Sequence, residues 1–107
     1  MVPAIEDKLN DLSKRMEIVS QNYFFARRIL SNNMEMSEDN FLILINYMKC
    51  VRACYEKLES TQKRFINNEY FYQGYLNWWK KEMTQKEYLV LKIKSIVNFL
   101  EDFYASI

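Results

Sequence analysis

The stretch FLILINYMKCVRACY, residues 41–55, decides the fold of this chain. Drawn as a helix, it gathers its polar side chains on one narrow strip, formed by Asn46, Lys49 and Arg52 and continued by Glu56. The rest of the circumference is apolar or aromatic, whereas an ordinary surface helix carries an apolar stripe only somewhat wider than about 100°. The run is too short and too interrupted by charge for a membrane span, which needs roughly 20 apolar residues. We therefore predict a central helix that other helices cover on several sides.

The composition of the whole chain predicts an all-α protein. With 107 residues, the chain is long enough for one core, so we expect a single helical-bundle domain over residues 1–107. Gly74 and Pro3 are the only residues of their kinds. Because hairpins and long loops depend on Gly and Pro for their turns, such segments are disfavoured. The prediction is an antiparallel helical bundle of three long helices and one short one, similar to a four-helix bundle.

The first two helices are expected at about residues 4–30 and 38–66. In each of them apolar side chains recur at alternating spacings of three and four, which is the pattern of a helix–helix seam. Ser37 is a suitable N-cap for the second helix, and the connection before it is short enough to make the two helices antiparallel neighbours. Gln62 is the only polar residue in the second seam.

A short third helix is expected at about residues 69–81 and a long fourth helix at about 85–104. Thr84 and Glu87 have the spacing of a capping box, which predicts the start of the fourth helix. In an up-and-down bundle of these helices, the most apolar parts of all four would meet at one end. We therefore expect the start of the second helix to be covered at that end.

The residue types that most enzymes need are missing. The chain contains no histidine, which removes the commonest general base and the usual His ligands of metal sites. A single glycine excludes a Gly-rich phosphate loop, and the acidic residues lie mostly outside the seams. Cys50 and Cys54 share a helix face, but two thiols per chain supply only half of a zinc site, and packing is their commoner role. We expect no enzyme activity, no cofactor and no metal.

Charge and composition limit the partners and the location. The formal net charge is +1, whereas duplex-DNA binders usually have a basic excess or a basic face. The first 15 residues carry charges throughout and lack the apolar core of a signal peptide, so the expected location is cytoplasmic. Lys, Asn, Ile, Tyr and Phe are frequent, which is typical of AT-rich coding sequences such as those of many phages and mobile elements.

One stretch has the composition of a binding site. It combines closely spaced aromatic side chains with lysines, and its candidate partner-binding residues are Tyr70, Tyr72, Tyr75, Trp78, Trp79, Lys80 and Lys81. Such residues either fill the core of a small bundle, anchor a protein interface or stack on the bases of single-stranded nucleic acid. Aromatic residues occupy all sides of the expected helix 69–81, which favours an exposed interface.

These patterns lead to two functional hypotheses. The first is a small non-enzymatic regulator, inhibitor or adaptor that binds another protein through an aromatic helical surface. The apolar circumference of residues 41–55 also admits a homodimer. The alternative is a nucleic-acid-binding protein that uses the Trp/Lys segment 75–86. Arg52, beside the crowded part of the second helix, is expected to pair with an acidic residue across the bundle.

Overall fold

Helices alone make up the secondary structure in the part of the chain that the structure describes, so the predicted all-α bundle of three long helices and one short one is confirmed. This computed structural model describes residues 2–32, 35–72 and 76–106. The elements are α1 (Val2–Ser31), α2 (Glu38–Glu56), α3 (Ser60–Ile66), the π-helix η1 (Asn67–Phe71) and α4 (Gln85–Ser106). Because η1 continues α3 without interruption, the two together form the short helix.

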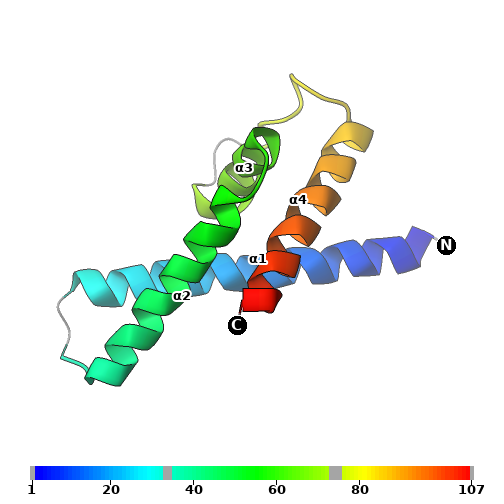
Figure 1. Cartoon of the computed structure of the whole chain (residues 1–107). Helices are drawn as coiled ribbons and strands as arrows, with labels where there is room; N and C mark the ends of the chain where they lie inside the picture. Colours follow the sequence, from blue (N-terminus) through cyan, green and yellow to red (C-terminus); the bar gives the residue numbers. More distant parts are fainter. Residues whose placement is uncertain (1, 33–34, 73–75, 107) are drawn as a thin grey trace.

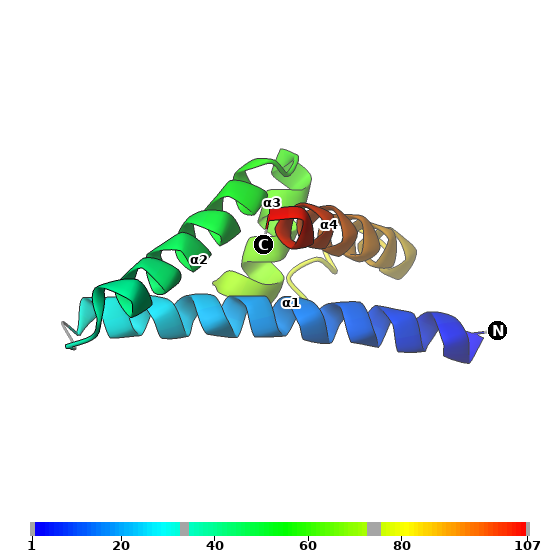
Figure 2. The same cartoon turned by 60° about the horizontal axis from the view of Figure 1, so that its bottom comes forward.

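α1 is a long rod, and the other helices pack against the same side of it (Figures 1 and 2). α2 folds back obliquely over the C-terminal half of α1, and α4 runs beside α2 in the opposite direction. α1 has 30 residues and extends past the helices packed against it, so its N-terminal end projects beyond α4. The molecule is accordingly elongated, with extents of 48 × 28 × 23 Å.

The core lies where α3 and α4 cross the middle of α1 and the second half of α2. Fully buried side chains come from each of these helices, among them Met16, Val51, Phe65, Ile96 and Phe99. A layer of partly buried aromatic side chains packs against them, formed by Tyr23, Tyr47, Tyr55, Phe71, Trp78 and Tyr88. Many of the ring pairs meet edge to face, the arrangement that the aromatic quadrupole favours.

Both predicted helix starts are confirmed by their capping bonds. The Ser37 hydroxyl accepts a hydrogen bond from the Asn40 backbone N–H at 3.2 Å. At the start of α4, the Glu87 N–H donates to the Thr84 hydroxyl at 3.1 Å, and the Thr84 N–H donates to the Glu87 carboxylate at 2.9 Å. This reciprocal pair satisfies two backbone donors that the first turn of a helix leaves unpaired.

The prediction of one helix over residues 38–66 is wrong in its middle. α2 ends at Glu56, and α3 begins only at Ser60. Gln62 is not a polar member of a continuous seam, because its side-chain oxygen accepts a hydrogen bond from the Glu59 backbone N–H at 3.3 Å. This bond belongs to the start of a new helix, and it allows the chain to turn between α2 and α3.

The prediction of a helix over residues 69–81 is also wrong. Residues 67–71 belong to η1, which ends the preceding helix, and residues 76–82 form turns. Asn77 has φ = 59°, a left-handed conformation that Asn tolerates better than most residues, and its carbonyl accepts a hydrogen bond from the Lys80 N–H at 3.1 Å. Gly74 lies outside the described residues.

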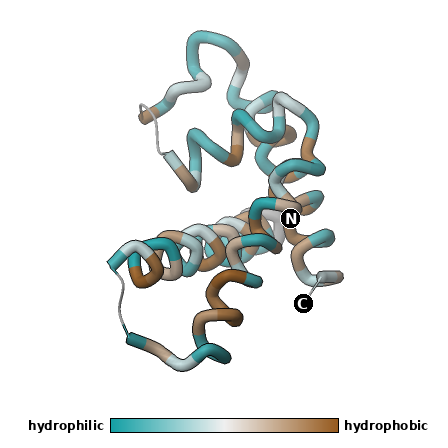
Figure 3. The backbone as a smooth tube through the Cα atoms, turned by 60° about the vertical axis from the view of Figure 1, so that its left-hand side comes forward, coloured by the Kyte–Doolittle hydropathy of each residue, from teal (hydrophilic) through white to brown (hydrophobic). Residues whose placement is uncertain are grey.

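The most apolar parts of the helices do not meet at one end, contrary to the prediction. α2 begins at the end of the molecule that lies opposite the beginning of α4 (Figures 1 and 2). Figure 3 shows the first half of α2 as a hydrophobic stretch at the edge of the fold. The break after α2 explains this arrangement, because it directs α3 and α4 toward the middle of α1 and away from the start of α2.

The helices can also be compared with the dimensions of a bilayer. Among the described residues, no helix combines the length and the apolar character that a membrane span requires.

Candidate functional site

Tyr70, the first of the predicted binding residues, is part of the core. Its side chain is 6% exposed, and its hydroxyl forms a 2.8 Å hydrogen bond with the hydroxyl of Ser13 on α1. Burial raises the pKa of Tyr70 to about 12, although the bond to Ser13 acts in the opposite direction. Tyr70 therefore joins η1 to α1 and presents little surface to a partner.

Trp78 and Trp79 attach the turn segment 76–83 to the bundle. The Trp78 ring meets Phe65 edge to face at 6.0 Å, and its indole N–H donates to the Glu69 carboxylate at 2.9 Å. The Trp79 ring stacks on Tyr88 of α4 at 4.3 Å. Both indoles are half-buried, so most of their area already serves packing within this chain.

An ion pair reinforces this attachment. The Arg64 guanidinium on α3 forms a two-pronged ion pair with the Glu82 carboxylate, and it also lies over the Trp78 ring at 5.4 Å. The hydrogen bonds from Arg64 hold the pKa of Glu82 below its usual value. The turn segment 76–83 thus covers the end of the bundle beside α3.

The other predicted residues that the structure describes lie at the surface. Tyr72 is 72% exposed, and Lys80 and Lys81 are exposed on the turn segment. Tyr75 lies outside the described residues. Because the segment is folded as turns and not as a helix, its side chains do not share the helical face on which the prediction depends.

A run of uncovered apolar side chains lies on α2. Within the run Phe41–Ile45 none of the five side chains is buried, and Phe41, Leu42 and Ile43 are 45%, 47% and 63% exposed. We call these three residues the α2 apolar surface. Single exposed apolar side chains are normal, whereas contiguous exposed apolar patches mark interaction sites. Successive residues of a helix are about 100° apart, so these three side chains spread around the first turns of α2.

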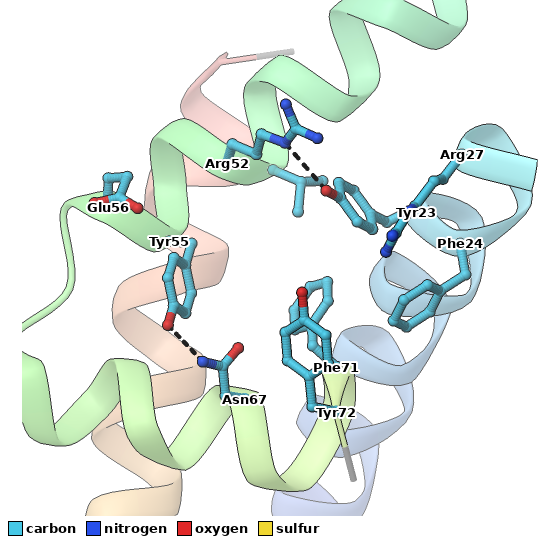
Figure 4. A pocket seen from close by; sticks show the side chains of 10 residues that line it. Tyr23, Phe24, Arg27, Arg52, Tyr55, Glu56, Asn67, Phe71 and Tyr72 are labelled. Atoms are coloured by element: carbon cyan, nitrogen blue, oxygen red, sulfur yellow. Dashed lines mark hydrogen bonds between the residues drawn. The ribbon is translucent and has the colours of Figure 1, made fainter. Parts of the chain in front are cut away.

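A pocket of about 500 Å³ lies between α1, α2 and η1 (Figure 4). Its lining side chains are Tyr23, Phe24, Arg27, Val51, Arg52, Tyr55, Glu56, Asn67, Phe71 and Tyr72. Two hydrogen bonds cross its rim: the Arg52 Nε–H donates to the Tyr23 hydroxyl at 3.1 Å, and the Asn67 amide donates to the Tyr55 hydroxyl at 2.7 Å. The expectation that Arg52 pairs with an acidic residue is therefore wrong, since its partner is a neutral tyrosine.

The sequence does not predict this pocket, because its walls come from three separate segments. The one local signal is the spacing of Glu59 and Gln62, which fits the start of a helix. A helix start at this point requires a turn after α2, and the turn brings η1 opposite α1.

The cysteines have the surroundings of packing residues. Cys54 is 1% exposed, and burial raises the pKa of its thiol to about 11, so the thiol stays protonated at neutral pH. Both Cys50 and Cys54 are free thiols. Over residues 2–32, 35–72 and 76–106, no group of three or more Cys, Asp or Glu side chains is placed to hold a metal ion.

Comparisons with known proteins give no match to this chain. No protein-family model matches the sequence, and neither a curated protein nor a solved structure shows significant similarity to it. The geometry of the chain itself therefore carries the functional argument.

Proposed function

We propose that this protein is a non-enzymatic regulator, inhibitor or adaptor that binds another protein chain through the α2 apolar surface. One observation carries the proposal: the most hydrophobic run of the sequence begins a long helix, yet three of its side chains remain largely exposed. Apolar side chains of a helix that its own chain leaves uncovered are typical anchors for a groove on a partner.

The polar surroundings of this surface favour a protein partner. Exposed Glu38 and Asp39 precede the apolar run, and exposed Asn46 and Lys49 follow it. An apolar centre within a polar rim is the usual anatomy of a protein interface. Helices that bind membrane surfaces are instead rich in Lys and Arg on their polar face, and acidic residues beside the apolar run would be repelled by anionic lipids. A second copy of this chain is one candidate partner.

The nucleic-acid alternative has less support from the geometry. It requires aromatic faces that are free to stack on bases, with cations beside them. One face of Trp79 is already stacked on Tyr88, and Trp78 is held by Phe65 and Arg64. The exposed Lys80 and Lys81 alone would supply only weak, salt-sensitive attraction to phosphate.

Changing Ile43 to Glu is expected to weaken partner binding at least about tenfold, because burying an Ile side chain contributes roughly 1.5–3 kcal/mol and burying an unpaired charge opposes binding. Sedimentation velocity measures self-association, and affinity purification from the source cells followed by titration measures binding to a different partner.

Ile93→Glu is the matched control, because Ile93 is a 38% exposed isoleucine on a different helix, α4. It is expected to bind like the unmodified protein. Two results would contradict the proposal: full binding by Ile43→Glu, or an equal loss in both variants. A chain that stays monomeric and retains no partner would also contradict it.

A further inference from the structure

Two arginines border the pocket between α1, α2 and η1 without a carboxylate partner. Arg27 extends from α1 and Arg52 from α2, and both side chains lie at the pocket in Figure 4. Among the described residues, no salt bridge involves either guanidinium. Glu56, the acidic residue of the lining, is paired with Lys63 at 3.2 Å. The lining therefore carries two guanidinium groups and one carboxylate, a formal net charge of +1, and the carboxylate pairs with Lys63 and with neither arginine.

The hydrogen-bonding groups of the pocket are arranged to donate. Arg52 uses its Nε–H on the Tyr23 hydroxyl, which leaves the two terminal NH₂ groups of its guanidinium for another acceptor. The Tyr23 and Tyr55 oxygens both act as acceptors in their bonds to Arg52 and Asn67, so each hydroxyl proton remains available. A ligand with anionic oxygens would satisfy these donors.

The body of the pocket is aromatic. Five of its ten lining side chains are Tyr or Phe. Phe71 meets Tyr23 edge to face at 5.6 Å, and it lies at a tilt to Phe24 at 5.9 Å. Such walls suit a flat ring, which can stack or contact them edge-on. The volume of about 500 Å³ lies within the range of small-molecule sites, roughly 300–1,000 Å³.

The π-helix η1 is a second, independent observation at the same place. It contributes Asn67 and Phe71 to the lining, and its end is closed by the wide hydrogen bond from the Tyr72 N–H to the Asn67 carbonyl, at 2.7 Å. π-Helical turns are rare and concentrate at functional sites, because the extra residue in the turn changes the direction of the side chains around it.

We propose that this pocket binds a small aromatic anion, in which a planar ring carries a carboxylate or phosphate group. The anionic oxygens lie between Arg27 and Arg52, and the ring lies against Phe71 and Tyr23. The site is separate from the α2 apolar surface and gives the protein a small-molecule ligand in addition to a protein partner.

The test uses four probes on the unmodified protein: naphthoate, naphthamide, adenosine monophosphate and adenosine. Calorimetry gives the affinity, and amide chemical shifts in ¹⁵N-labelled protein locate the site. At least one anion is expected to bind saturably below about 1 mM, with the largest shifts around Arg52 and Phe71. Its neutral counterpart is expected to bind about tenfold more weakly or worse, since a charge-assisted hydrogen bond is lost. Whether naphthoate or the nucleotide binds more tightly distinguishes a carboxylate from a phosphate ligand.

Three variants assign the effect to the pocket. Arg27→Gln and Arg52→Gln are each expected to weaken the anion about tenfold, whereas Arg28→Gln, beside Arg27 but outside the lining, leaves the affinity unchanged. Ile43→Glu also leaves it unchanged, so failure of the protein-binding proposal does not affect this one. The inference is overturned if neither anion binds, if the neutral compounds bind equally well, or if Arg28→Gln weakens binding as much as Arg52→Gln.

Discussion

Replacing Phe65 by Ala is expected to lower the free energy of unfolding by about 3–5 kcal/mol. The Phe65 side chain is fully buried, and its ring contacts both Trp78 and Tyr88. It therefore joins α3 to the turn segment and to α4. A loss of this size is a large part of the roughly 5–15 kcal/mol that stabilises a typical domain. Urea denaturation followed by circular dichroism measures it.

Phe25→Ala is the control for this substitution. The Phe25 ring is 57% exposed on α1, so its removal leaves no cavity, and the expected loss is below about 1 kcal/mol. Equal effects of the two changes would contradict the placement of Phe65 in the core.

The free energy of unfolding is also expected to fall as the pH rises from about 10 to about 12. Burial raises the pKa of Tyr70 to about 12 from an ordinary value of 10.0, and burial also raises the pKa of Tyr88. Between these pH values the unfolded chain releases tyrosine protons that the folded chain retains. The unfolded state then binds fewer protons, so its stability relative to the folded state increases with pH. For Tyr70 alone the effect is on the order of 2 kcal/mol.

Tyr70→Phe provides the comparison for the alkaline range. At neutral pH this variant is expected to be less stable by about 1 kcal/mol, because it loses the hydrogen bond to Ser13. Its stability should nevertheless fall less steeply above pH 10, because the variant lacks the Tyr70 hydroxyl, whose proton the folded protein retains in this pH range. Denaturation curves measured at several pH values test both statements, and an unchanged slope would contradict the burial of the Tyr70 hydroxyl.

The sequence predicts the all-α class, the first and last helices and two helix starts, because those features depend on local interactions. Ser37 and Thr84 start helices through bonds to residues three positions away, and periodicity indicates which faces are buried. The break between Glu56 and Ser60 is harder to predict, since the apolar spacing continues through it. Because the sequence pattern predicts no break here, it also predicts the wrong boundaries for the next helix and more complete covering of α2 than the structure has.

The candidate sites depend on contacts between segments that are distant in the sequence, and the spacing of apolar residues does not reveal such contacts. The aromatic stretch appears exposed on all sides only if it is drawn as a helix; folded as turns around Asn77, it directs Trp78 and Trp79 toward α3 and α4. The pocket needs Arg27, Arg52 and Phe71 to meet, although they lie far apart in the sequence. Such a meeting follows from the tertiary packing.

Photo-crosslinking in the source cells tests the central claim, protein binding through the α2 apolar surface, most directly. A benzophenone amino acid replaces Ile43 in one protein and the exposed Lys94 of α4 in another. We predict that position 43 crosslinks to one defined protein, either a second copy of this chain or a different partner, and that position 94 does not. The absence of a crosslink from position 43, or the same crosslink from both positions, would contradict it.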